Sequence, residues 1–220
     1  LGDVYKRQLQ AADTPCQTVI RHEMLITPQA ALQHSIDAFL NHRAYWALTH
    51  AHEELRVSAY TEVNTRVIAP AIAQQSWETV REHFRYRGGH SGDVHAGMVF
   101  GSHHCPVHPD FAAYAQSSFT PGRPLMQAAQ ALTARMHRDF HYETASTDIN
   151  TPALEALQAR RGVCQDFAHI LVACLRSLGL PARYVSGYLL TQPPPGQARL
   201  VGSDASVSYT HLTLPTNREV

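Results

Sequence analysis

Residues 161–188 read RGVCQDFAHILVACLRSLGLPARYVSGY, and this stretch decides the fold. Its apolar residues recur at three- and four-residue intervals, which predicts an α-helix with one broad buried face. These residues are Phe167, Ile170, Leu171, Cys174, Leu175 and Leu178. Gly179 suits the left-handed residue that ends a helix, and Pro181 prevents the helix from continuing. The run 182–190 is rich in β-branched and aromatic residues, so we expect a strand there.

Cys164 lies in the first turn of this predicted helix, directly after residues 162–163. A thiol at a helix N-terminus feels the partial positive charge of backbone N–H groups, which favours the nucleophilic thiolate. A free cysteine is more often a small, inert hydrophobic residue, and Cys174 on the same helix fits that description better. Because Gln165 and Asp166 place polar groups around Cys164, we interpret Cys164 as a catalytic nucleophile.

The residues around Cys164 resemble a known family. The runs GVCQDFAH (162–169) and GLPARYVSGY (179–188) are similar to the core of bacterial transglutaminase-like proteins, which belong to the papain-like thiol superfamily. Upstream, DFHY (139–142) and TDINT (147–151) resemble the stretch that leads to the family's cysteine. The match is most specific around Cys164.

The N-terminal part of the chain is also similar to this family. DAF (37–39) and EELRV (53–57) resemble the strand-rich region that accompanies the core, so the resemblance covers roughly residues 9–205. It implies an α+β fold, in which the cysteine helix packs on an antiparallel sheet in a papain-like transglutaminase core. A small β-rich N-terminal domain would precede that core.

The resemblance further implies a thiol-dependent enzyme with a Cys-His-Asp triad, a transglutaminase-like cysteine protease, amidase or acyltransferase. In such a triad the imidazole accepts the thiol proton, and a carboxylate orients the imidazole ring. The thiolate attacks an amide carbonyl, and water or an amine resolves the thioester. The implied substrate is a protein or peptide, attacked at a glutamine side chain or at a peptide bond, with Cys164 as nucleophile.

The family's histidine follows the signature Gly-x-Asp-Ala-Ser, which this chain carries as GSDAS at 202–206. The expected histidine position is therefore 207, and it holds valine. We expect the triad histidine and aspartate to lie beyond the native end of the fragment, so the full-length parent is an enzyme and the fragment is inactive. The alternative is a non-catalytic binding or scaffold protein with a degenerate papain-like core.

The two ends of the sequence offer an explanation for this departure. Residues 1–8 (LGDVYKRQ) match one reading frame of a common transposase sequencing adapter, and VSYTHLTLPT (207–216) matches a frame of the opposite arm. We therefore expect native protein from about residue 9 to residue 205. The residues outside this range carry no information about the fold. On this interpretation His211 is not the missing base.

Composition shifts and motifs predict the organisation of the chain. In order, we expect an adapter translation (1–8), a β-rich transglutaminase-like N-terminal region (9–70), a linker or irregular helical segment (71–119), a truncated transglutaminase-like core (120–206) and a second adapter translation (207–220). Alternating polarity over 55–67 predicts a half-buried strand, and 19–26 predicts a weaker one.

Further local patterns fill in this outline. Residues 87–93 contain three glycines and predict a loop. A helix is expected to open at 121–124, and its apolar face consists of Leu125, Ala129, Leu132, Met136 and Phe140. Thr151 is the predicted N-cap of a short helix that runs through Ala159.

Histidines other than the expected one at 207 are poor candidates for chemistry. His169 follows Cys164 by five residues, which rotates it about 140° around the helix, so we predict a structural role for it. The run 103–108 (HHCPVH) matches no closed zinc pattern and predicts a surface loop. His137 and His141 would share a helix face, but no third ligand is apparent, so we expect an exposed helix end. We predict neither a metal nor a cofactor.

Composition excludes several classes of function. A hydrophobic content of 44% and a charged content of 16% are typical of a globular chain with a core. The formal net charge of zero suggests no nucleic-acid partner, and no apolar run is long enough to predict a membrane span. Four cysteines without disulfide or zinc-motif spacing indicate a reducing, cytoplasmic setting.

Overall fold

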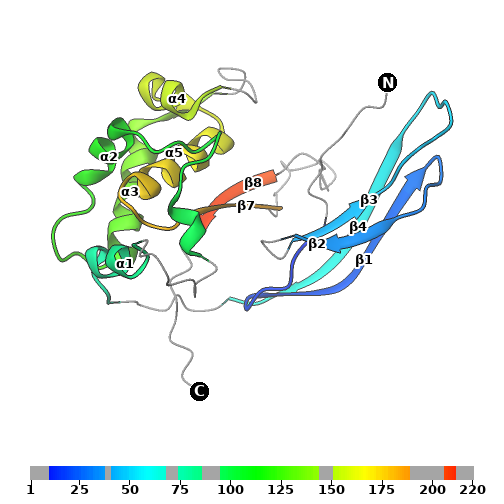
Figure 1. Cartoon of the computed structure of the whole chain (residues 1–220), viewed down its shortest axis with the longest axis horizontal. Helices are drawn as coiled ribbons and strands as arrows, with labels where there is room; N and C mark the ends of the chain where they lie inside the picture. Colours follow the sequence, from blue (N-terminus) through cyan, green and yellow to red (C-terminus); the bar gives the residue numbers. More distant parts are fainter. Residues whose placement is uncertain are drawn as a thin grey trace, which may run out of the picture. The chain divides into compact units, whose positions relative to one another are not determined.

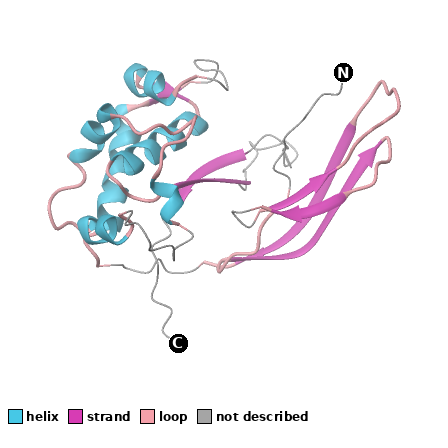
Figure 2. Cartoon of the chain, in the orientation of Figure 1, coloured by secondary structure: helices cyan, strands magenta, loops and turns pink. Residues whose placement is uncertain are grey.

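The structure, a computed structural model, describes residues 10–37, 41–67, 74–85, 95–143, 151–188 and 206–211. The chain combines helices and sheets, as the α+β prediction requires, and divides into two units, Leu1–Pro70 and Ala71–Val220 (Figure 1). The described residues of the first unit form strands and loops, and those of the second form mainly helices (Figure 2).

Two antiparallel strand pairs form the described part of the first unit. Strand β1 (Gln17–Thr27) pairs with β4 (Arg56–Thr65) in a register that shifts once, between Val19 and Arg21. Strand β2 (Gln33–Ile36) pairs with β3 (His42–Tyr45). Both strands predicted from the sequence are therefore present. Strand β1 is longer than the predicted 19–26, and β4 is shorter than the predicted 55–67.

The β4 strand is less buried than its alternating sequence predicts. Val57 and Thr61 are half-buried, but Ala59 and Val63 on the same predicted face are exposed. None of the described residues of this unit is fully buried. An isolated two-stranded pair offers little surface for burial, which explains why the predicted apolar face is only partly covered.

The second unit is built around one helix. Its helical elements are α1 (Trp77–His83), the 3₁₀ helix η1 (Ala96–Val99), α2 (Pro109–Gln116), α3 (Leu125–Asp139), α4 (Ala153–Ala159) and α5 (Cys164–Ser177). Strands β5 (His141–Tyr142) and β6 (Arg161–Gly162) pair in parallel, and β7 (Arg183–Tyr188) and β8 (Ser206–His211) pair antiparallel. Helix α5 contacts α2, α3 and α4 as well as both strands of the β7–β8 pair. Among the helices that the structure describes, none has the length and apolar character needed to cross a bilayer.

Apolar side chains of α5 and α3 form much of the core. The predicted helix is confirmed, but its buried face differs from the predicted stripe. Of that stripe, Phe167 and Leu171 are only half-buried, whereas the other four residues are buried. Ala168, Val172 and Ala173 are buried as well. In α3, the predicted residues Leu125, Leu132 and Met136 are buried, whereas Ala129 is only half-buried and Ala128 occupies the core instead.

Residues 71–119, predicted as a linker or irregular helical segment, supply part of the same core. Trp77 is 6% exposed, and Phe111 and Phe119 are fully buried. The rings of Trp77 and Phe119 meet edge to face with centroids 5.8 Å apart, and Trp77 Nε1 donates to the Thr120 carbonyl at 3.0 Å. The described parts of this stretch are therefore integral to the second unit. The loop predicted at 87–93 lies outside the described residues.

The ends of α5 and α4 follow local rules. Gly179 has φ +77°, and its N–H and that of Leu180 donate to the carbonyls of Arg176 and Leu175, each at 2.9 Å. This is a Schellman motif, and it confirms the predicted helix end at Gly179. Helix α4 begins one residue later than predicted, because Pro152 rather than Thr151 is its N-cap.

Candidate active site

Cys164 is the first residue of α5, and Val163 is the N-cap. Cys164 is half-buried, whereas Cys174 on the same helix is fully buried. Burial raises the pKa of the Cys174 thiol to about 12, so this thiol stays protonated and inert at neutral pH. The two sulfurs of α5 therefore have different surroundings, as the sequence predicts.

The segment that leads into Cys164 is held by backbone hydrogen bonds. Strand β6 pairs in register with β5, so that Arg161 lies opposite His141 and Gly162 opposite Tyr142. The His141 N–H donates to the Arg160 carbonyl at 2.9 Å, and the Glu143 N–H donates to the Gly162 carbonyl at 3.0 Å. These bonds fix the chain just before it turns into α5.

The buried side chain of Asp166 caps the first turn of α5. Its side chain is 3% exposed, and Oδ2 accepts a hydrogen bond from the Val163 N–H at 2.8 Å. This is the acidic half of a capping box, since valine has no side-chain acceptor for the reciprocal bond. A Cβ placed on Gly162 would lie 2.6 Å from that same oxygen. The carboxylate therefore fills the space that a side chain at 162 would need, a contact that no pattern in the sequence predicts.

A cluster of aromatic and basic side chains supports the start of β6. Arg160 adopts the left-handed conformation (φ 54°, ψ 31°) where α4 ends. Its guanidinium carbon lies 4.3 Å from the ring centroid of Tyr114 and 5.0 Å from that of Phe140. Stacking of a cation on two aromatic rings holds Arg160, and with it the chain four residues before Cys164.

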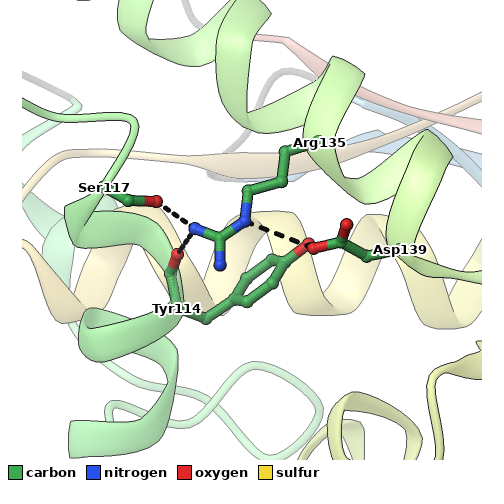
Figure 3. Close-up of polar contacts among 4 residues, drawn as sticks. All are labelled: Tyr114, Ser117, Arg135 and Asp139. Carbon is green, nitrogen blue, oxygen red and sulfur yellow. Dashed lines mark hydrogen bonds and ion pairs between the residues drawn. The ribbon is translucent and has the colours of Figure 1, made fainter.

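Tyr114 links α2 to α3 beside this cluster (Figure 3). Its hydroxyl donates to Asp139 Oδ2 at 3.0 Å, and Arg135 Nε donates to the same oxygen at 3.2 Å. Arg135 Nη1 also donates to the Tyr114 carbonyl at 2.6 Å and to Ser117 Oγ (Figure 3). Burial and the hydrogen bond to Asp139 raise the pKa of Tyr114 to about 12.

His169 has a packing role in the structure. It is 8% exposed and stacks on His104 with centroids 5.2 Å apart, and it also contacts the ring of Tyr184. Burial and His104 lower the pKa of His169, although Asp166 acts in the opposite direction. No sequence signal links His104 to His169, because they lie far apart in the chain.

The predicted loop at 103–108 is only partly a surface loop. His103 and His104 are exposed, but Cys105 is 4% exposed and belongs to the core. His108 is the N-cap of α2, and its Nδ1 accepts from the Asp110 N–H at 3.2 Å. In the part of the chain that the structure describes, no group of three or more His, Cys, Asp or Glu side chains could hold a metal ion.

The predicted pairing of His137 and His141 on one helix face is wrong. Helix α3 ends at Asp139 with Phe140 as its C-cap, and His141 lies in β5. Phe140 turns into the core at 6% exposure, which takes the chain out of the helix before a second histidine could align.

Position 207, where the family resemblance expects a histidine, lies in β8. Its backbone pairs with Gly187 of β7, and both strands contact α5. The preceding residues 201–205, which include most of the GSDAS signature, lie outside the described part of the chain.

A hollow of about 570 Å³ lies at the other end of α5. Its walls include Arg81, Phe84, Phe100 and Gly179. With a rise of about 1.5 Å per residue, the helix separates Gly179 from Cys164 by roughly 20 Å. This hollow is therefore not part of the site around Cys164.

Comparison with known proteins matches both units. The model of the transglutaminase-like superfamily matches residues 112–215, and that of the bacterial transglutaminase-like N-terminal region matches residues 7–64. Uncharacterized proteins of Mycobacterium tuberculosis and Mycobacterium bovis are each 35% identical over 205 residues, or 90% of this chain and 64% of their own length. A Mycobacterium leprae protein is 28% identical over 79% of this chain and 60% of its own length. The chain thus spans less than two thirds of these relatives.

One solved structure shares the fold. It is a Cytophaga hutchinsonii protein whose crystal structure is described as that of a "putative cysteine protease". The TM-score is 0.63 at 23% identity, and the match covers 81% of this chain and 59% of the other.

Proposed function

Because this chain belongs to the transglutaminase-like superfamily and has a papain-like thiol fold, we propose that its full-length protein catalyses acyl transfer or amide hydrolysis with Cys164 as nucleophile. The supporting observation is the place of Cys164, half-buried at the first position of α5. The first helical turn places unpaired backbone N–H groups beside this sulfur. The proposed substrate is a protein or peptide amide in the cytoplasm.

The proposed reaction begins with the Cys164 sulfur attacking the amide carbonyl carbon. The carbonyl oxygen becomes an oxyanion, for which the Cys164 backbone N–H is the candidate donor. A base takes the thiol proton and returns it to the leaving amine, and water or a second amine then resolves the thioester. In the full-length protein we assign that base to a histidine after the GSDAS signature. This chain carries Val207 there, so we expect no turnover from it.

Alkylation of the native chain tests the nucleophile. Iodoacetamide is expected to modify Cys164 at least about tenfold faster than Cys174 at pH 7, because one thiol is at a helix start and the other is sealed in the core. Peptide mass spectrometry resolves the two sites, and the exposed Cys16 supplies the rate of an ordinary accessible thiol. In the full-length protein, Cys164→Ala should abolish turnover.

Two results would count against the proposal. A Cys164 that reacts more slowly than Cys16 has no activated thiol, and turnover in the Cys164→Ala variant of the full-length protein places the chemistry elsewhere. If Val207 is native and not part of the second adapter translation, it favours the second candidate function, a non-catalytic binding or scaffold protein. The gene sequence of the full-length protein distinguishes the two functions, since the enzyme needs a histidine codon directly after the GSDAS codons.

A further inference from the structure

The hollow at the C-terminal end of α5 has the size of a small-molecule site. It encloses about 570 Å³, and ligand pockets in proteins occupy roughly 300–1,000 Å³. Three parts of the second unit form its walls: the end of α1, the end of η1 with the loop after it, and the end of α5. Cys164 lies at the opposite end of α5, so a ligand bound in the hollow stays apart from the proposed reaction.

Apolar side chains form one part of the wall. Phe84 is 3% exposed at the C-cap of α1, and Val99 in η1 is half-buried. Phe100 and Val107 are 57% and 54% exposed. Among the described residues of the second unit, Tyr142 is the one other large apolar side chain that is exposed to this degree. The exposed apolar surface of this unit is therefore concentrated in the hollow, as it is in ligand sites.

Positive charge forms the other part of the wall. Arg81, Arg85 and Arg176 line the hollow together with a single carboxylate, that of Glu82. Arg85 Nη1 lies 3.5 Å from Glu82 Oε2, so one arginine matches this carboxylate. Arg81 places its guanidinium carbon 4.7 Å from the ring centroid of Trp77. The wall thus carries two cations beyond this ion pair, which makes it complementary to an anion.

Arg176 is the partly buried cation of this wall. Its Nε and Nη2 donate to the Ala182 carbonyl at 3.0 and 2.7 Å, and its Nη1 donates to Ser102 Oγ at 3.1 Å. These hydrogen bonds all go to neutral oxygens, and they use three of the five N–H groups of a guanidinium. Burial lowers the pKa of Arg176, although Cys105 acts in the opposite direction. The guanidinium has lost hydration, and a bound anion would compensate its charge.

We propose that this hollow binds a small organic anion with an apolar body, such as an aryl or alkyl carboxylate or sulfonate. The anionic head would lie at Arg176 and Arg81, and the apolar body would lie against Phe100 and Val107. The two arginines come together because α1 packs on the end of α5: Arg81 Cγ is 3.3 Å from a Cβ placed on Gly179, three residues after Arg176. This site does not depend on the proposed function of Cys164.

Two fluorescent probes that differ by one sulfonate group test the proposal on the chain as it stands. Anilinonaphthalene sulfonate carries the charge, phenylnaphthylamine has the same rings without it, and both brighten in an apolar site. Arg176→Met should weaken binding of the charged probe about tenfold and of the neutral probe less than about twofold, because charge-assisted hydrogen bonds are lost. Arg176→Lys should retain most of the affinity for the charged probe, since lysine keeps the charge. Phe100→Ser should weaken binding of both probes.

Further variants separate binding from folding. Arg81→Met changes an exposed residue and should also weaken binding of the charged probe alone, which decides the matter if Arg176→Met does not fold. Arg138→Gln is the matched control, because Arg138 is an exposed arginine in the last turn of α3, and it should change neither affinity. Circular dichroism checks that each variant is folded.

Three results would overturn the inference. One is a folded Arg176→Met or Arg81→Met variant that binds the charged probe as well as the unmodified chain does. Another is a loss of charged-probe binding in Arg138→Gln as large as that in Arg176→Met, which would show a general attraction to positive surface. The third is a loss of binding in Phe100→Ser alone, which would indicate an apolar occupant instead. None of these results bears on Cys164.

Discussion

At Gly162 the missing side chain is a structural requirement. Glycine there would usually be explained by backbone freedom, but its φ of 159° is close to extended backbone. The reason is steric, because the Asp166 carboxylate caps the Val163 N–H from the space that a Cβ would occupy. The Gly-Val-Cys-x-Asp pattern is thus one packed unit that fixes the first turn of α5.

Substitution of Gly162 measures this packing. Gly162→Ala should lower the free energy of unfolding by about 1–3 kcal/mol, because the new Cβ overlaps Asp166. Gly97→Ala is the control, since no heavy atom lies within 4 Å of its added Cβ, and it should change stability by no more than about 0.5 kcal/mol. Urea unfolding curves compare the two. Equal midpoints would show that Asp166 moves aside without cost.

Among the elements, the contact between α2 and α3 depends on a buried tyrosine. The Tyr114 hydroxyl and Arg135 share Asp139, and the guanidinium carbons of Arg135 and Arg160 both lie 4.3 Å from the Tyr114 ring centroid. The same Arg160 starts the segment into β6. The contact between α2 and α3 and the position of the segment that leads through β6 to Cys164 therefore both depend on the Tyr114 ring.

This contact should weaken at alkaline pH. Tyr114 has a folded pKa of about 12 against an ordinary value of 10, so its contribution is fully present below pH 10 and is lost as pH rises to 12. The loss is on the order of 2 kcal/mol in unfolding free energy. Denaturant titrations between pH 9 and pH 12 should show a shallower decline for Tyr114→Phe than for the unmodified chain. The remaining decline reflects Cys174, whose pKa is also raised to about 12, and Cys105, whose pKa burial raises as well. Identical slopes would contradict the assignment.

Helix α5 could be predicted closely from sequence because its signals are local. The apolar spacing, the Gly179 end and the start at Cys164 all lie within one continuous run. The capping contact of Asp166 and the stacking of His169 on His104 could not be predicted in the same way. The first needs the orientation of a side chain, and the second joins segments that only the folded core brings together.

At the scale of the whole molecule, the two units differ in how much they bury. Trp77, Phe111 and Phe119 lie in the core of the second unit although their segment reads as irregular in the sequence. Periodicity fails there because short helical pieces are separated by loops, so no single stretch displays a complete apolar face. In the first unit the two long strands β1 and β4 were predicted and the four-residue strands β2 and β3 were not, and the shallow burial of β1 and β4 follows from how few strands pair.

Hydrogen exchange should separate the two units. Amides in the middle of α5, such as Ile170 and Ala173, are expected to exchange at least about 100-fold more slowly than those of β4, such as Tyr60 and Thr61. Exchange in the middle of α5 requires the core around it to unfold. The described residues of the first unit include none that is fully buried, so amides of β4 can exchange through local openings. Exchange resolved by peptide or by residue checks this. Comparable protection in α5 and β4 would show that both units unfold together.

Because Cys174 is buried, its alkylation measures how often the core of the second unit opens. Its sulfur is sealed on the helix that presents Cys164. A reagent can reach it only during excursions that expose the interior, so adducts at that position count unfolding events. Adducts at Cys164 over the same time course count collisions with the intact protein. The alkylation rate at Cys174 therefore reports how often the core opens, and the rate at Cys164, ten residues away, reports the reactivity of the folded surface.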